Sequence, residues 1–327
     1  MSLTVQHLNG DCTFLFAFAP AFATSDHPHR FPGAFTILVD PWLAGHSSVF
    51  HPSFQYTKHV NKPHINSLAD LKQDVDLIII SQDKPDHCHR ETLCSLPKGK
   101  NVNILATSAA VKKINSWRHF NPANVHALST YRPENPESLI RITLPAYTKT
   151  SSPGEITIAH LPTPRDLTKV HNALAITYRP PDTIFPQSSD NLTISSNPPS
   201  PTPTLSLLYT PHGIPLRALR PYLTHHLQNI PLTVLLHAFN AERNPSCLGG
   251  DVVRGAPGGL ELIHALDGKV GTWIGAHDAP VERRGWSVKW LRSRMYGAEE
   301  VEKWVREEGF GTVVRGLRAG EVVRLGG

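Results

Sequence analysis

Reactive side chains gather directly after the most hydrophobic run of the chain. Residues 76–80 read DLIII, and the polar segment 82–89 (QDKPDHCH) follows one residue later. In it, Asp86 and His87 are adjacent, so a carboxylate oxygen and an imidazole nitrogen can both approach one cation, at about 2.0–2.2 Å for zinc. The chain holds 19 histidines, and a single loop histidine is usually an ordinary solvated side chain, so the pair alone is a weak signal.

The elements around this segment predict a rigid support for it. The strand expected over 76–80 contains the continuous apolar run LIII, which is typical of a strand buried on both faces. A short helix from about Glu91, a strand over 102–105 and a helix over 109–117 follow, which is an α/β rhythm. Because loops that leave strand ends carry the chemistry of such folds, we expect the site at the carboxyl end of strand 76–80.

The remaining pattern is rich in strands. We expect a turn at Asn9-Gly10-Asp11 between the first two strands, a brief helix at 67–72 and a final strand pair joined by a turn at 319–320. We interpret residues 1–327 as a single domain, with a Pro/Ser-rich surface insertion at about 180–203. The other expected strands are 3–8, 12–18, 35–39, 139–144, 156–160, 173–178, 205–209, 232–237, 270–274, 312–314 and 321–325, and the other helices lie near 216–228 and 298–308.

Composition excludes several classes of protein. The 327 residues are 40% hydrophobic and 18% charged, which does not fit a collagen, a coiled coil or a disordered chain. The four cysteines form no CxxC pair, which fits a reducing compartment and predicts a cytoplasmic protein. The apolar run 14–23 lacks the basic flank of a signal peptide and is too short to span a bilayer.

The net charge of +5 is a weak indication of any anionic partner. The cationic stretch 283–324 is interleaved with glutamates, and we interpret it as a solvated helical surface. We therefore expect a small-molecule substrate, no nucleic-acid partner and no membrane partner. The oligomeric state stays open.

Two motifs and the order of elements resemble a known superfamily. An opening hairpin leads to ILVDPW at 37–42, and the buried strand then ends in QDKPDH at 82–87. This arrangement is similar to the metallo-β-lactamase fold, specifically to metal-dependent hydrolases related to ascorbate-6-phosphate lactonase, in which that strand ends in HxHxDH. The resemblance implies an α+β fold, a four-layer αββα sandwich built from two similar halves.

The resemblance also implies a degenerate active site. Family members bind two metals, and the two leading histidines of the motif, ligands of the first metal, fall on Gln82 and Lys84. The third ligand would fall near His160, loosely in register. The aspartate that bridges both metals falls within 209–213 (YTPHG), which has no carboxylate. The first metal site is therefore expected to be lost.

The second metal site keeps its implied ligands. Asp86 and His87 match the last two motif positions, and His277 matches the family's terminal histidine. These three would suffice for one divalent ion, zinc first, with an open coordination position. His212 stands where the bridging aspartate would be, as a fourth ligand or a general base. Alternatively, Lys84 replaces the lost positive charge and pairs with Asp86, and no metal is bound.

Two functions remain open from the sequence. One is a divergent hydrolase in which a single metal-activated water attacks an ester, lactone, amide or phosphodiester bond, with Lys84 contacting an oxyanion or an anionic substrate. The other is a catalytically inactive member that serves as a binding or regulatory module.

Neighbouring residues carry smaller expectations. We expect Asp40 to fix a strand-end turn, Asp278 to cap the turn that follows it, and His237 to face the same cleft from a strand end. Cys88 and Cys94 are interpreted as buried structural thiols rather than as reactive thiolates.

Overall fold

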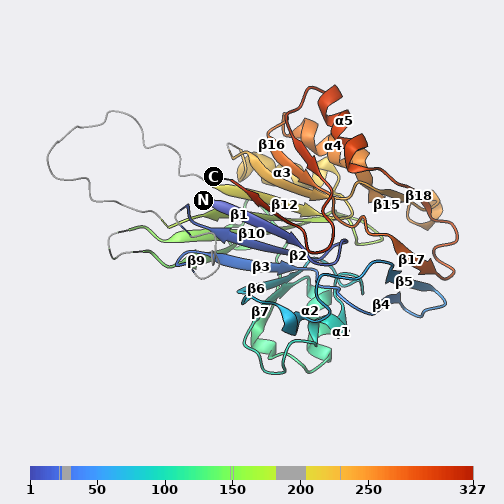
Figure 1. Cartoon of the computed structure of the whole chain (residues 1–327), viewed down its shortest axis with the longest axis horizontal. Coiled ribbons are helices and arrows are strands. Elements are labelled where there is room, and N and C mark those ends of the chain that lie inside the picture. The colour runs from blue at the N-terminus through green and yellow to red at the C-terminus, as the bar shows by residue number, and fades with distance from the viewer. Residues whose placement is uncertain are drawn as a thin grey trace.

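The protein is described by a computed structural model that covers residues 1–21, 23, 31–147, 149, 151–181, 204–228 and 230–326. Two seven-stranded sheets pack face to face, and helices cover their outer faces (Figure 1). The predicted four-layer αββα sandwich is thus confirmed. Most of the expected insertion, positions 182–203, lies outside the described residues.

The first sheet has the order β20-β1-β2-β3-β6-β7-β8. Strand β6 lies inside this sheet between the parallel neighbours β3 and β7, and all four of its residues are buried, as the apolar run predicts. The strands are β1 (Ser2–His7), β2 (Phe14–Ala19), β3 (Phe35–Val39), β6 (Leu77–Ile80), β7 (Asn103–Ala106), β8 (Val125–Ala127) and β20 (Val322–Leu325).

The second sheet has the order β19-β16-β13-β12-β11-β10-β9. Its strands β12, β13 and β16 run parallel, so their carboxyl ends meet at one edge. The strands are β9 (Ile140–Leu144), β10 (Gly154–Pro162), β11 (Asn172–Arg179), β12 (Leu205–Thr210), β13 (Leu232–His237), β16 (Val270–Ile274) and β19 (Val313–Arg315).

Two three-stranded sheets stand beside the sandwich, in the orders β15-β14-β18 and β17-β5-β4. Their strands are β4 (His46–Val49), β5 (Gln55–His59), β14 (Ala241–Arg243), β15 (Asp251–Arg254), β17 (Val281–Arg284) and β18 (Arg292–Arg294). The interpretation of 283–324 as one helical surface is wrong, because its first part forms β17, a turn and β18. A helix, α5, begins only at Ala298.

Helices α1 (Arg90–Leu93) and α2 (Ser108–Ser116) follow strands of the first sheet, and α3 (Leu216–His225), α4 (Gly255–Ala265) and α5 (Ala298–Glu307) lie with the second. Short 3-10 turns occupy Leu68–Asp70, Pro122–Asn124, Pro136–Ser138 and Ser246–Leu248. The first of these is the brief helix expected at 67–72, and the side chains of Ser67 and Asp70 cap it reciprocally. None of the described helices is long and apolar enough to cross a membrane.

One expectation about the elements is wrong, and one helix was not expected. The final strands do not pair with each other: β19 lies parallel to β16 in the second sheet, whereas β20 lies antiparallel to β1 in the first. Helix α4 was not expected because its sequence opens with Gly-Ala-Pro-Gly-Gly, a run of poor helix formers. Tertiary packing favours it there, since Gly259 lies so close to the Trp273 ring that a Cβ would clash.

Candidate metal centre

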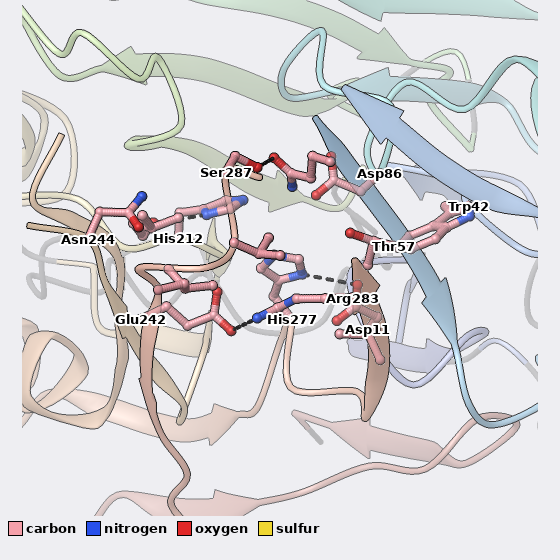
Figure 2. A pocket seen from close by; sticks show the side chains of 15 residues that line it. Asp11, Trp42, Thr57, Asp86, His212, Glu242, Asn244, His277, Arg283 and Ser287 are labelled. Carbon is pink, nitrogen blue, oxygen red and sulfur yellow. Dashed lines mark hydrogen bonds and ion pairs between the residues drawn. The ribbon is translucent and has the colours of Figure 1, made fainter. Parts of the chain in front are cut away.

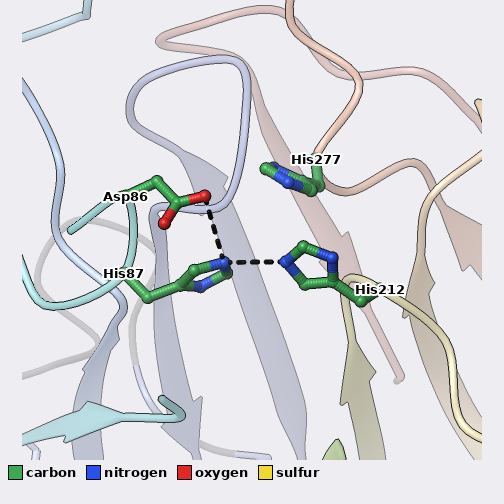
Figure 3. A group of neighbouring side chains, drawn as sticks. All are labelled: Asp86, His87, His212 and His277. Carbon is green, nitrogen blue, oxygen red and sulfur yellow. Dashed lines mark hydrogen bonds and ion pairs between the residues drawn. The ribbon is translucent and has the colours of Figure 1, made fainter. Parts of the chain in front are cut away.

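Four side chains from three loops converge between the two sheets (Figure 3). Asp86 and His87 follow β6, His212 follows β12, and His277 follows β16. Their potential ligand atoms all lie within 4.8 Å of one another. The Nε2 atoms of His87 and His212 are 3.1 Å apart, and His87 Nε2 lies 3.8 Å from Asp86 Oδ2. The structure thus brings together all the residues that the resemblance implies for the second metal.

Asp40 orients His87. The carboxylate of Asp40, which exposes no surface, lies 2.7 Å from His87 Nδ1, and it also accepts hydrogen bonds from Ser81 and from the Tyr209 hydroxyl. A carboxylate only accepts, so His87 Nδ1 carries a proton and Nε2 faces the cluster. Asp40 has a φ of 46°, a conformation that an L residue adopts at a cost, and its role extends well beyond the expected turn.

Asp11 performs the same task for His277. His277 Nδ1 lies 3.0 Å from Asp11 Oδ2, and the His277 backbone N–H donates to the Asp11 carbonyl. His277 adopts a φ of 69°, which this backbone contact holds in place. Burial would lower the pKa of His277, but the charge of Asp11 and its hydrogen bond outweigh that cost and raise the pKa to about 9.

His212 is held by a backbone carbonyl. Its Nδ1 lies 3.1 Å from the carbonyl oxygen of Val252 at the start of β15, so this nitrogen donates and Nε2 faces His87. Burial lowers the pKa of His212 well below its usual range, and the neighbouring imidazoles of His277 and His87 lower it further. His212 is therefore a neutral imidazole with a free nitrogen lone pair.

The donor set of the centre fits a bound cation. In the neutral forms, His87 and His212 turn two Nε2 lone pairs toward each other at 3.1 Å, an arrangement that a cation bound to both nitrogens stabilises. Two nitrogens at about 2.0–2.1 Å from a tetrahedral zinc ion stand roughly 3.3 Å apart. Metal-binding histidines donate their other N–H to a carboxylate or carbonyl, as all three imidazoles do here. The residues present therefore fit a divalent metal.

A cavity of about 110 Å³ opens beside the centre (Figure 2). Asp86, His212 and His277 line its inner end, so a ligand in the cavity can reach the cluster. The rim carries Arg283, which pairs with Glu242. Apolar side chains complete the wall, namely Trp42, Val252, Val281, Val288 and Leu291.

Three sequence-predicted residues lie elsewhere. Lys84 lines neither this cavity nor the one beside Gln82, and among the described residues it forms no ion pair with Asp86, so the expected cationic stand-in is not formed. The Lys84 carbonyl instead accepts hydrogen bonds from backbone N–H groups within the segment 81–89 between β6 and α1, which we call the motif loop. Gln82 and His160 lie outside the cluster and line a second cavity.

Of the smaller expectations, the one for Cys88 is confirmed, and those for Asp278 and His237 are wrong. Cys88 is buried, and burial raises the pKa of its thiol to about 12, as expected of a structural thiol. Cys94 is only half-buried, so the expected burial is wrong for this residue, although desolvation also raises its pKa. The expected capping role of Asp278 is wrong in its target: its carboxylate accepts from the backbone of Phe239 and Asn240 after β13, not from the turn that follows it. His237 is fully buried at the end of β13 and does not line the cavity.

The sequence did not identify Asp11 as the residue that orients His277. It appears in the sequence only as the third residue of a tight turn, and its partner His277 lies 266 positions later. The turn motif alone holds no signal for this contact. Asp40, in contrast, stands in the ILVDPW motif, which marks the residue without revealing its bond to His87.

Comparisons with known proteins agree with this fold. Residues 30–195 match the sequence model of the family described as Beta-lactamase superfamily domain, and the chain belongs to this family. Members of this family typically bind metal ions, which is consistent with the His/Asp cluster and with a metal-dependent hydrolase. No curated protein matches the chain.

Two solved structures are similar over almost their whole length. The metallo-beta-lactamase fold protein YhfI from Bacillus subtilis is 11% identical with a TM-score of 0.47, and the alignment covers 99% of each chain. Unliganded yeast PDE1 is 10% identical with a TM-score of 0.48, and the alignment covers 99% of this chain and 98% of that one.

Proposed function

We propose that this protein is a hydrolase that uses one divalent cation, zinc, held by Asp86, His87, His212 and His277. One observation carries the proposal: three imidazoles, each with Nδ1 committed to an acceptor, turn Nε2 toward one point beside a carboxylate. Imidazole nitrogens and carboxylate oxygens are the usual ligands of zinc, and zinc-binding histidines usually donate their other N–H to an acceptor that orients the ring. The substrate is a small molecule with an ester, lactone, amide or phosphodiester bond.

The chain's own residues position this chemistry. A bound divalent cation would supply Lewis acidity, which activates water near neutral pH and polarises a carbonyl or phosphoryl oxygen. Asp40 and Asp11 fix His87 and His277, so the ligands are oriented before any ion arrives. Catalysis also needs access for substrate and water, and the adjoining cavity of about 110 Å³ provides it.

His212 acts in this proposal as a ligand and not as a general base. A general base works best when its pKa lies near the operating pH. Burial and the neighbouring imidazoles lower the pKa of His212 well below that range, so it would hold a proton poorly. Its Nε2 lone pair is nevertheless available for coordination, and Val252 fixes its orientation.

A second candidate is a catalytically inactive protein that keeps the scaffold as a binding or regulatory module. Gln82 and Lys84 stand where the family's first metal has two histidine ligands, and this observation favours it. Such a protein could still bind the metal, so only activity together with metal content separates the two functions.

For the compartment, the described cysteines are all free, which supports a reducing, cytoplasmic location.

The first experiment is elemental analysis of protein purified after growth with added metals. We expect about one equivalent of zinc in the wild type, because closely held ligand sets are well occupied. His87→Ala and His277→Ala should retain under about a tenth of an equivalent. His126→Ala, on the exposed strand β8, is the matched control and should keep the full complement. Equal metal content in all four proteins would exclude the centre.

The second experiment measures hydrolysis by the metal-loaded protein. The panel holds p-nitrophenyl acetate, a γ-lactone, an anilide and bis-p-nitrophenyl phosphate. Turnover that disappears in His87→Ala and persists in His126→Ala supports the hydrolase. Full metal content with no turnover across the panel would favour the inactive binding module.

A further inference from the structure

A second cavity, of about 190 Å³, borders the start of the motif loop. It shares no lining residue with the cavity beside the metal centre. Its walls come from the start of the motif loop, the start of α2, the end of β10, the loop 163–171 and the start of β11. Gln82 and His160, the positions at which the resemblance implies ligands of the lost first metal, both line it.

This cavity is surrounded by polar side chains without partners. Among the described residues, both amide atoms of Gln82 lack a hydrogen bond, as do His160 Nδ1, Asn172 Oδ1 and the hydroxyls of Thr107 and Thr163. Gln82, His160 and Asn172 are each more than nine-tenths buried. Leaving one such group unpaired costs about 1–3 kcal/mol, so this concentration of them around one cavity requires an explanation.

The chemistry of the wall defines what it can bind. Burial lowers the pKa of His160 to about 4, so the imidazole is neutral near pH 7 and offers one donor and one acceptor. The unpaired amide and hydroxyl groups are also neutral and include both donors and acceptors. A ligand hydroxyl, which both donates and accepts, is complementary to every one of them.

The charged side chains at the cavity disfavour an anionic ligand. The carboxylates of Asp83 and Asp166 line it against the single ammonium group of Lys169, which leaves no excess positive charge for a phosphate or a carboxylate. Asp166 is already satisfied, because it accepts from Thr168 and from the His171 backbone. His171 is the remaining titratable neighbour, and both of its ring nitrogens lie against backbone carbonyls.

From these observations we infer that the second cavity binds a small, uncharged polyhydroxylated molecule, of the size of a pentose or a short polyol. A volume of about 190 Å³ equals the liquid volume of roughly six waters, since one water occupies about 30 Å³. The unpaired atoms expose almost no surface, so ligand entry requires the Gln82 amide and the other side chains that carry these atoms to turn toward the cavity. This inference does not depend on metal binding or on hydrolysis.

The test compares the wild type with Gln82→Met, which keeps the side-chain length and removes both amide atoms. The probes are D-ribose and erythritol, followed by saturation-transfer NMR and by the shift in melting temperature up to 100 mM. We expect saturable binding to the wild type and at least a fivefold weaker signal with Gln82→Met. Gln6→Met, on β1 outside both cavities, is the control and should bind like the wild type.

A stability measurement keeps the test decisive if Gln82→Met alters folding. Removing an unsatisfied amide is neutral or stabilising, so the ligand-free variant should melt at or above the wild-type temperature. A marked fall in melting temperature would mean that ordered waters already satisfy Gln82, which overturns the inference. So would the absence of saturable binding of either polyol, or displacement of ribose by acetate or ethylammonium at equal concentration. Zinc content should not change in any of these variants, so a failure here is distinct from a failure of the proposed metal centre.

Discussion

Zinc binding at this centre should release a proton from His277, and the pH dependence of affinity should reveal it. With a pKa of about 9, set by the neighbouring charge of Asp11 against the cost of burial, this imidazole is protonated at neutral pH. A ligand must be deprotonated to coordinate. At pH 7, two pH units below that pKa, removing the proton costs about 2.7 kcal/mol, or about a hundredfold in apparent affinity.

The apparent dissociation constant for zinc should therefore fall about tenfold per pH unit between pH 7 and pH 9, and level off above. Isothermal titration calorimetry of metal-free protein, in buffers with different enthalpies of ionisation, gives both the affinity and the number of protons released. We expect about one proton per zinc at pH 7.

Asp11→Asn isolates the cause. The asparagine keeps the size and one oxygen acceptor but removes the charge, so burial should leave His277 neutral at pH 7.5 and proton release should approach zero. Asp74→Asn, whose carboxylate is 99% exposed, is the control and should behave like the wild type. A flat pH profile in the wild type, or an unchanged slope in Asp11→Asn, would refute the assignment of the proton to His277.

Three further outcomes follow from the same contacts. In metal-free protein, the raised pKa of His277 stabilises the fold. This contribution is complete below about pH 6.5 and is lost as the pH rises through about 9. The free energy of unfolding, measured in urea, should therefore fall by about 3 kcal/mol across that window. Tyr209→Phe removes a hydrogen bond to the Asp40 carboxylate and should cost about 1.5–3 kcal/mol in the same assay; no change would mean that the bond adds nothing. Lys84→Met should leave zinc content and melting temperature as in the wild type, because the lysine lines neither cavity. A loss of metal in this variant would mean that Lys84 does contribute to the metal centre.

Local sequence was informative where one segment carries both the element and its chemistry. The run 76–80 predicted a strand buried on both faces, and β6 is one, because its side chains alternate between two hydrophobic cores, one on each face of the sheet. The adjacency of Asp86 and His87 then placed both at the end of that strand. The motif resemblance added His277 and His212, which no local pattern could have linked to them.

Prediction failed where long-range packing decided the outcome. In the sequence, the two last strands look like a hairpin. In the structure each completes a different sheet, because β16 offers a free edge to β19 and β1 offers one to β20. Helix α4 contradicts its own propensities, because Ala256, Leu262 and Ile263 pack in the hydrophobic core, and tertiary packing of this kind outweighs propensity. Lys84 could not be placed from its motif position either, because the direction of a loop side chain depends on the neighbours around it.

The order of amino acids by itself determined which side chains exist to hold a cation and which strand presents the first two. The sequence order did not determine the protonation states of these side chains or the directions in which they point. Those were decided when the two sheets packed and brought Asp40 against His87, Asp11 against His277 and the Val252 carbonyl against His212. The physical reason is that a buried imidazole takes its tautomer and its charge from the acceptor it meets, and these acceptors lie 40 to 266 positions away in the chain.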